Sequence, residues 1–250
     1  MRSVRRSNFA KASDFAKASS DTSSDRLAFG VPTSPRLRRT GRRSATTEDS
    51  DAQFKARQIE RSFFETDPLT CARSMIGCEL RWGRAAGIIV ETEAYTEFGD
   101  EASHTFFRKS MPEFVRTRKP GTLYVYLNYG MHWLLNFLVK SSHSNGFVLV
   151  RALEPTAGVD LMFERRGVGD IRALCSGPGK LTQALAIDGA CNGVDFFELA
   201  DVELFPRKGT VEVETDRRIG INRSAEFDWR FLLVASKFVS ARKKTRPRGN

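Results

Sequence analysis

Short stretches of alternating apolar and polar residues are the main structural signal along this chain. The clearest covers residues 87–95, where β-branched residues alternate around Glu91 and Glu93 and predict a strand. Similar stretches predict further strands over residues 122–129, 147–151, 202–205, 211–214 and 230–235. The pair Glu154-Pro155 is expected to end the strand over 147–151, because proline cannot donate to a sheet.

Helical spacing occurs in fewer places. Asp67 is expected to cap a helix that starts at Pro68 and that Gly77 ends. Residues 131–140 continue as apolar structure, whereas residues 99–121 contain charges, glycine and proline and predict a long loop. Two more helices are predicted over residues 159–166 and 180–186. Because strands do not alternate regularly with helices, the pattern predicts an α+β domain with a mainly antiparallel sheet flanked by helices.

The start of the chain differs in composition from the rest. Residues 1–50 hold 11 Lys and Arg against 5 Asp and Glu, with few large apolar side chains to offset the chain entropy. We therefore expect a disordered basic tail over 1–51, a folded domain over 52–243 and a short basic C-terminal tail over 244–250. A DNA-tethering arm, a localisation signal, a solvated tail and a misassigned start codon all stay open as explanations of the first segment.

Composition limits the classes of function. The 250 residues carry a formal net charge of +10, which suits a polyanionic partner but is common among soluble proteins. No apolar run approaches the roughly 20 residues of a membrane span, and the N-terminus lacks the apolar core of a secretory signal. The four cysteines and three histidines show no metal-ligand spacing. We therefore expect an intracellular protein with neither a membrane partner nor a metal.

The predicted strand over 87–95 carries the first candidate catalytic groups. Side chains two positions apart share one face of a strand, so Glu91, Glu93 and Tyr95 are expected to lie together. A carboxylate with a like-charged neighbour and an aromatic ring beside it suits general-base chemistry. The alternative is an exposed edge face with solvated acids.

Tyrosines on the next predicted strand are further candidates. Tyr124 and Tyr126 share one face, and Tyr129 follows just before a turn. Aromatic rings at such a place can stack on a base or wedge between base pairs, and ordinary strand packing is the alternative.

Two polar residues stand in apolar surroundings. Arg151 ends an apolar run and needs an acid or a phosphate, with a structural pair to Glu154 as the alternative. Asn136 lies within another apolar run and needs hydrogen-bond partners, whether it belongs to the core or to a site.

Six stretches of the sequence, in order and at compatible spacing, resemble the alkyladenine (3-methyladenine) DNA glycosylase family. They are Ile89-Val-Glu-Thr-Glu-Ala-Tyr95, Pro120-Gly-Thr-Leu-Tyr-Val-Tyr126, Tyr129-Gly-Met-His-Trp133, Val150-Arg-Ala-Leu-Glu-Pro155, Gly177-Pro-Gly-Lys-Leu181 with Gln183-Ala-Leu185, and Arg218-Ile-Gly-Ile221. The similarity runs from about Asp67 to about Ser240. Residues 105–118 and 236–240 depart from the family's usual sequence.

The resemblance implies a curved sheet and a monofunctional enzyme of base excision repair. Such an enzyme flips an alkylated or deaminated purine out of the duplex and hydrolyses its N-glycosidic bond, leaving an abasic site. The substrates implied are 3-methyladenine, 7-methylguanine, hypoxanthine and ethenoadenine. The partner would be double-stranded DNA carrying damaged purines, bound by a monomer without a cofactor and in the compartment that holds genomic DNA.

The resemblance also assigns the chemical step. Glu93 matches the general base that activates the attacking water, and Arg151 matches the residue that helps to hold this water. A main-chain carbonyl near Ile221 would complete the water site. Glu91 is left as a structural or tuning neighbour, and no lysine falls at the position of a nucleophile, so Schiff-base chemistry is not indicated.

The remaining matched residues bind the flipped nucleotide or the DNA around it. Tyr95, His104 and Tyr126 match the pocket that sandwiches the flipped base. Tyr129 matches the wedge that fills the gap left in the duplex. Asn136 matches the residue thought to exclude normal guanine through its exocyclic amino group.

Two other classes of protein stay open on the residues alone. A carbohydrate-processing hydrolase could use Glu91 and Glu93, although its carboxylates must lie on opposite sides of the scissile bond. A basic nucleic-acid-binding protein could use the aromatic residues as a platform. Glu93 argues against this second class, because a pure binder has no need of a carboxylate beside phosphates.

Overall fold

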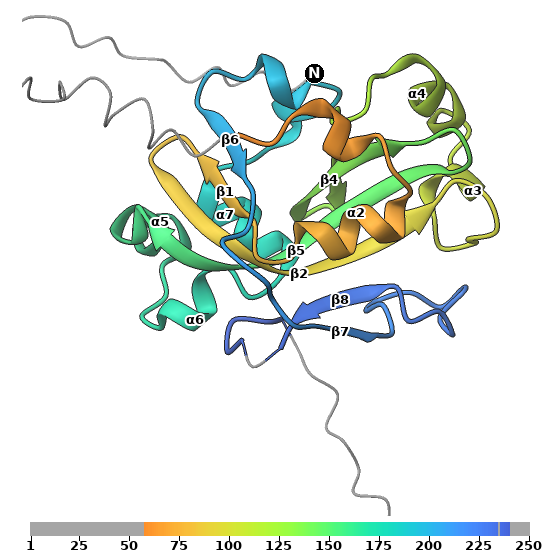
Figure 1. Cartoon of the computed structure of the whole chain (residues 1–250). Helices are drawn as coiled ribbons and strands as arrows, with labels where there is room; N and C mark the ends of the chain where they lie inside the picture. Colours follow the sequence, from red (N-terminus) through yellow and green to blue (C-terminus); the bar gives the residue numbers. More distant parts are fainter. Residues whose placement is uncertain (1–57, 235, 241–250) are drawn as a thin grey trace, which may run out of the picture. The chain divides into compact units, whose positions relative to one another are not determined.

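An antiparallel sheet organises the part of the chain that the computed structural model describes, residues 58–234 and 236–240 (Figure 1). Its strands are β1 (Glu79–Trp82), β2 (Ala85–Thr96), β3 (Leu123–Asn128), β4 (His132–Lys140), β5 (Asn145–Ala157), β6 (Val202–Phe205), β7 (Val213–Asp216) and β8 (Arg230–Leu233). They lie in the order β3-β4-β5-β2-β1-β6, and β8 pairs with both β2 and β7. Each pairing is antiparallel, which confirms the predicted sheet.

Helices pack against this sheet and connect its strands. The α-helices are α2 (Pro68–Met75), α3 (His104–Phe107), α4 (Met111–Thr117), α5 (Val159–Arg166), α6 (Ile171–Leu174) and α7 (Pro178–Leu185), and the 3-10 helices are η1 (Arg61–Phe64), η2 (Gly189–Cys191) and η3 (Phe196–Glu198). Helix α2 packs against β2 and β5, α7 packs against β4 and β5, and α5 packs against α7 (Figure 1). The predicted α+β class is therefore confirmed. The tails predicted over 1–51 and 244–250 lie outside the described residues.

The capping pattern of α2 follows the sequence closely. The Asp67 carboxylate accepts hydrogen bonds from the backbone N–H groups of Leu69 at 3.0 Å and Thr70 at 2.9 Å. Proline occupies the first turn, where its missing N–H costs nothing. Gly77 follows the helix with φ +88°, a backbone conformation that favours glycine.

The two faces of β2 have different surroundings, and this difference places the site. Thr92 faces α2, because its hydroxyl donates to the Ala72 carbonyl at 2.9 Å. Side chains alternate along a strand, so Glu93 and Tyr95 point to the opposite face. The main apolar core lies on the α2 side. A smaller cluster packs with Tyr95 on the other side and consists of Met111, Val115, Tyr124, Leu138 and Phe147.

The prediction of a long loop over residues 99–121 is wrong, since α3 and α4 occupy part of this segment. Helix α4 is held by burial of Met111 and Val115, four residues apart on one helical face. Pro112 stands in its first turn, where proline is tolerated. The charges, glycine and proline of this segment favoured a loop in the sequence pattern, so the short amphipathic helix was not predicted.

Two strand predictions also need correction. Strand β5 does not end at Glu154-Pro155 but continues to Ala157. Pro155 pairs with Gly87 beside a register shift, and irregularities of this kind accommodate proline within a sheet. Strand β1 was not predicted, because four residues between a helix and a tight turn are too few to show an alternating pattern.

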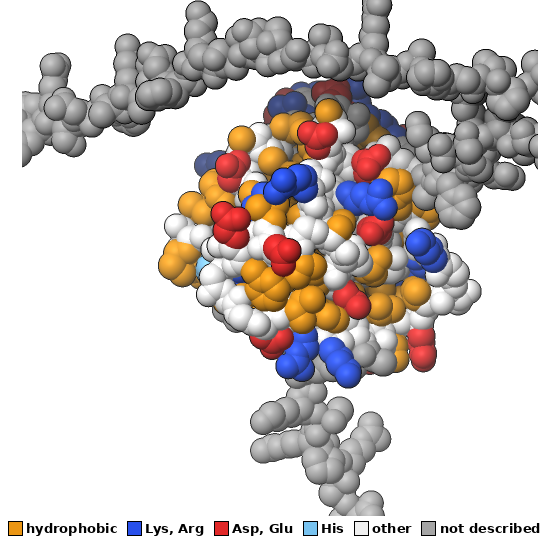
Figure 2. Space-filling model, turned by 90° about the vertical axis from the view of Figure 1, so that its left-hand side faces the viewer, with side chains coloured by type: hydrophobic (Ala, Val, Ile, Leu, Met, Phe, Trp, Pro, Cys, Tyr) orange, Lys and Arg blue, Asp and Glu red, His pale blue; other side chains and the backbone are white. Residues whose placement is uncertain are grey.

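Charge on the described surface is mixed. Figure 2 shows acidic and basic side chains interspersed over one face, the left-hand side of Figure 1. Among the described residues, no helix combines the length and apolar character needed to cross a membrane. All four cysteines are unpaired thiols.

Candidate active site

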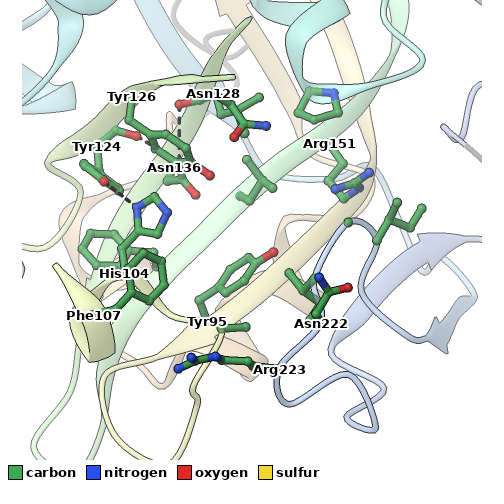
Figure 3. Close-up of a pocket in the computed structure, with 18 of the residues that line it drawn as sticks. Tyr95, His104, Phe107, Tyr124, Tyr126, Asn128, Asn136, Arg151, Asn222 and Arg223 are labelled. Carbon is green, nitrogen blue, oxygen red and sulfur yellow. Dashed lines mark hydrogen bonds between the residues drawn. The ribbon is translucent and has the colours of Figure 1, made fainter. Parts of the chain in front are cut away.

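A cavity of about 640 Å³ lies on the Tyr95 side of the sheet (Figure 3). This volume falls in the range of small-molecule sites. Strands β2 to β5, helix α3 and the loop over 219–223 supply its walls. Seven of the residues predicted to form the site line it: Tyr95, His104, Tyr126, Tyr129, Asn136, Arg151 and Ile221. The eighth, Glu93, is fully buried and contacts the cavity-lining Tyr95 and Arg151.

The Glu93 carboxylate is held at three points. Its Oε2 accepts hydrogen bonds from the Tyr95 hydroxyl at 2.8 Å and from Arg151 Nη1 at 3.2 Å. Its Oε1 accepts one from the backbone N–H of Ile219 at 2.7 Å. A buried charge requires such partners, and these come from three separate segments of the chain. The side chain is therefore fixed in orientation beside the cavity.

Arg151 connects the two acids of β2. Its Nε donates to Glu91 Oε1 at 3.0 Å, while its Nη1 reaches Glu93. Burial alone lowers the pKa of Arg151, but the charges of Glu93 and Glu91 outweigh it and raise this pKa above the usual value. The alternative pair with Glu154 is wrong, and so is the alternative of solvated acids, because both glutamates of β2 are fully buried.

An irregular register brings these groups together. The pairing of β2 with β5 shifts on both sides of Glu91, which pairs with Ala152, while Thr92 pairs with Val150. Arg151 is thus the extra residue of a bulge on β5. Bulges re-aim side chains next to active sites, and here the bulge directs the guanidinium toward both carboxylates.

Aromatic rings form the wall across from Arg151. The His104 ring lies 4.4 Å from the Tyr126 ring, centroid to centroid, and its Nδ1 shares a hydrogen bond of 2.6 Å with the Tyr124 hydroxyl. Burial, assisted by the charge of Arg108, lowers the pKa of His104 to about 4, so the ring is neutral at pH 7. Burial also raises the pKa of Tyr124 to about 12 and keeps its hydroxyl protonated.

Tyr95 is supported from behind by an arginine. The Arg218 guanidinium carbon lies 4.6 Å from the centroid of the Tyr95 ring and 5.0 Å from that of Trp229. Asp100 pairs with it through two hydrogen bonds of 2.6 and 2.8 Å, and the side chains of both partners are fully buried. Arg218 also donates to the Ala94 carbonyl at 3.0 Å, so it fixes both the ring and the strand that carries it.

Tyr129 stands at the tip of the hairpin between β3 and β4. Its φ of 50° is unusual for a residue with a side chain, and 82% of its surface is exposed. Gly130 follows with φ 68°, and the N–H of Met131 donates to the Asn128 carbonyl at 3.1 Å to close the turn. An exposed aromatic ring in a constrained backbone conformation is typical of a contact surface.

Asn136 combines the two interpretations that the sequence left open. It is buried, and its Nδ2 donates to the carbonyls of Tyr124 at 3.0 Å and Leu134 at 3.4 Å. It nevertheless lines the cavity. The amide is therefore a buried group whose two Nδ2 hydrogen bonds fix its orientation at the cavity wall.

Comparisons with known proteins agree with this geometry. Residues 62–237 match the family model described as Methylpurine-DNA glycosylase (MPG). The chain belongs to the methylpurine-DNA glycosylase family. It is accordingly a DNA N-glycosylase of alkylated-base repair, and the resemblance drawn from the six sequence stretches is confirmed.

The chain aligns with most of the length of individual relatives. A protein of Agrobacterium fabrum named "Putative 3-methyladenine DNA glycosylase" is 44% identical over 183 residues, which are 73% of this chain and 92% of the relative. A protein of the same name from Rhizobium etli is 45% identical over 180 residues, 72% of this chain and 87% of the relative. One from Nitrosospira multiformis is 40% identical over 177 residues, 71% and 91% respectively.

This methylpurine-DNA glycosylase has cavity residues that the sequence analysis gave no role. Tyr124 is not one of them, since the sequence made it a candidate through the strand face that it shares with Tyr126. Four that carried no signal are Phe107 at the end of α3, Asn128 at the end of β3, and Asn222 and Arg223 in a loop. The Ile219 N–H group was also missed, because a backbone donor leaves no trace in the sequence. In the described part of the glycosylase, no cluster of three His, Cys, Asp or Glu residues could hold a metal ion.

Proposed function

We propose that this chain excises 3-methyladenine and related damaged purines from double-stranded DNA by base flipping and hydrolysis, leaving an abasic site. The observation that carries the proposal is the buried Glu93–Arg151 pair next to an aromatic cavity of about 640 Å³. The names of the relatives from Agrobacterium fabrum and Rhizobium etli support the choice of 3-methyladenine. A monomer acting on genomic DNA inside the cell is part of this proposal.

Glu93 is proposed to be the general base. Departure of the purine leaves an oxocarbenium-like sugar, which a nearby negative charge stabilises. Oε1 of Glu93 accepts one hydrogen bond among those described, so it retains acceptor capacity for a proton of the attacking water. Arg151 lines the cavity and touches Glu93, which suits it to hold that water. The carbonyl of Ile221 is the proposed third partner.

The aromatic walls suit a flipped purine. Tyr95 lies on one side of the cavity, and His104 and Tyr126 lie on the other (Figure 3). An alkylated purine is often cationic, and a cation is attracted to aromatic faces. The neutral His104 adds no charge that would repel it. We propose 3-methyladenine, 7-methylguanine, hypoxanthine and ethenoadenine as the substrate range.

Two further residues are proposed to contact undamaged parts of the DNA. The fixed amide of Asn136 cannot swing aside, so it is suited to exclude the exocyclic amino group of guanine by steric contact. The exposed ring of Tyr129 is suited to enter the duplex and fill the gap that the flipped base leaves.

The geometry does not favour a glycosidase of carbohydrates. Glu91 and Glu93 bind the same guanidinium and therefore lie on one side of the cavity. Carbohydrate-processing enzymes place their two carboxylates on opposite sides of the scissile bond.

Base release from duplex DNA tests the proposal. We expect the wild type to release 3-methyladenine, and Glu93→Gln to abolish release while DNA binding is retained. Glu97→Gln is the matched control, since Glu97 follows β2 directly and bonds Asn145 away from the cavity lining. Full activity of Glu93→Gln would remove the assigned base. Failure of the wild type on every alkylated or deaminated purine would contradict the proposed function.

A further inference from the structure

Glu91 is a fully buried carboxylate that the proposed chemistry does not use. Its Oε1 accepts hydrogen bonds from Arg151 Nε at 3.0 Å, Arg230 Nε at 2.8 Å and the Ser240 hydroxyl at 2.8 Å. Its Oε2 accepts the backbone N–H of Ser240 at 2.5 Å. The family resemblance assigns it no step, yet it lies two residues from Glu93 on the same face of β2.

The partners of Glu91 come from three segments. Arg151 belongs to β5, Arg230 belongs to β8, and Ser240 lies at the end of the described chain. The other charged group on the same face of β2 is Glu93, which touches Glu91's partner Arg151 and not Glu91 itself. Two more groups lie against these partners: Asp216 pairs with Arg230 at 3.2 Å, and the Tyr95 hydroxyl bonds Glu93 and adds its charge effect at Arg151.

The contact from Glu91 determines which edge of Arg151 faces the reaction. A guanidinium is a planar fork with five N–H groups in fixed directions. Because Glu91 holds Nε, the group directed at Glu93 is Nη1. Glu91 also supplies a second negative charge, so the positive charge of Arg151 is shared between two carboxylates instead of falling on the catalytic one alone.

We propose that Glu91 is a positioning residue for the glycosylase reaction. Ser240 holds the Glu91 carboxylate in place through its N–H and hydroxyl groups. Glu91 orients Arg151 and takes part of its charge, which leaves Glu93 able to accept a proton from the attacking water. The inference rests on the roles proposed above for Glu93 and Arg151. The segment 236–240 departs from the family's usual sequence. Through Ser240 it contacts Glu91, which in turn binds Arg151 next to Glu93.

Loss of the Glu91 charge has two effects in one direction. Arg151 is left with Glu93 as its carboxylate partner, and a like charge near Glu93 disappears. Both favour the ionised form of Glu93 and make it a weaker base. The rate of base release falls, and the acidic limb of its pH dependence moves to lower pH.

The test compares Glu91→Gln with wild type in single-turnover excision of 7-methylguanine. This cationic base leaves without prior protonation, so the acidic limb reports on the protein base. We expect the maximal rate to fall about 10- to 100-fold, as misplacement of a catalytic group does, while the dissociation constant for DNA stays within about 2-fold. Asp216→Asn is the matched control, because Asp216 pairs with Arg230 and does not touch Arg151. It should keep the wild-type rate and pH profile.

The outcomes separate this inference from the proposed function. A wild-type rate and pH profile in Glu91→Gln overturn the positioning role, even if Glu93→Gln is inactive. An inactive wild type overturns the proposed function instead. If Glu91→Gln does not fold, Ser240→Ala decides, since it removes one hydrogen bond and leaves the charge in place. A rate lowered about 3-fold with unchanged DNA binding supports the role, and an unchanged rate overturns it.

Discussion

The hydroxyl of Tyr95 donates a hydrogen bond of 2.8 Å to Oε2 of Glu93. One tyrosine therefore forms a wall of the cavity and also orients the carboxylate behind that wall. Burial, together with the adjacent negative charge of Glu93, raises the pKa of Tyr95 well above its usual value, so the hydroxyl stays a donor. The family resemblance implies stacking for this residue, and the geometry adds a second role.

Tyr95→Phe should separate the two roles. It keeps the ring and removes one donor to a charged group, a contact worth about 1.5–3 kcal/mol. We expect the rate of base release to fall about 10-fold or more, with the dissociation constant for damaged DNA nearly unchanged. Tyr95→Leu should weaken both the rate and the binding, because it removes the ring as well. Single-turnover rates and binding titrations measure the difference, and equal effects of both variants on binding would contradict it.

The neutral His104 predicts a pH-dependent stability. Its pKa is about 4 in the folded protein against 6.5 in the unfolded chain, so the unfolded state binds more protons between these values. Stability should therefore fall as the pH decreases from about 6.5 towards 4, and should not change through this group above that window. Urea unfolding at pH 7 and pH 5 measures it. The loss should be smaller in His104→Gln, whereas His143→Gln, at an exposed site, should lose as much as wild type.

Alternation along β2 was enough to predict from the sequence that Glu91, Glu93 and Tyr95 lie together. It could not predict which acid Arg151 binds, because that depends on a register shift between β2 and β5. The pair between Asp100 and Arg218 was equally hidden, since the two are 118 positions apart and the stretch that begins at Arg218 does not indicate its partner.

Local signals also decided which elements were found. The capped helix after Asp67 and the long strand β2 were predicted because capping and alternation are local properties. Helix α4 was missed, because two buried residues in seven do not outweigh a composition that favours loops. The family resemblance supplied the register that placed His104 and Ile221 in the site, which composition and periodicity could not do.

Tyr129→Gly tests the proposed wedge without disturbing the hairpin. Glycine adopts the φ of 50° at no cost, so the free energy of unfolding should be unchanged or slightly higher. Excision from duplex DNA should fall about 10-fold or more, since a few kcal/mol of unstacking is no longer offset. Excision from single-stranded DNA should fall less. Ile171→Ala, an exposed apolar residue of α6, is the control, and an equal loss on both substrates would exclude a wedge.

Removal of residues 1–50 should leave the chemistry intact, because every predicted site residue lies between 93 and 221. The segment carries 11 Lys and Arg against 5 Asp and Glu, so its loss should weaken DNA binding and flatten its dependence on salt. Turnover with saturating short duplex DNA measures the first effect, and binding at several salt concentrations measures the second. A large fall in turnover at saturation would place the segment in the site.

Asp100→Asn should lower the free energy of unfolding more than most substitutions of a buried acid in this domain. It leaves the fully buried Arg218 without its charge partner, and breaking a buried pair from one side costs about 3–5 kcal/mol. The exposed pair of Asp170 with Arg172 provides the comparison, since solvent screens this pair and Asp170→Asn should cost far less stability. Because Arg218 supports the Tyr95 ring, Asp100→Asn should also slow base release at temperatures where the variant is still folded. Urea unfolding and single-turnover excision test both effects, and equal stabilities of the two variants would show that Arg218 finds other compensation.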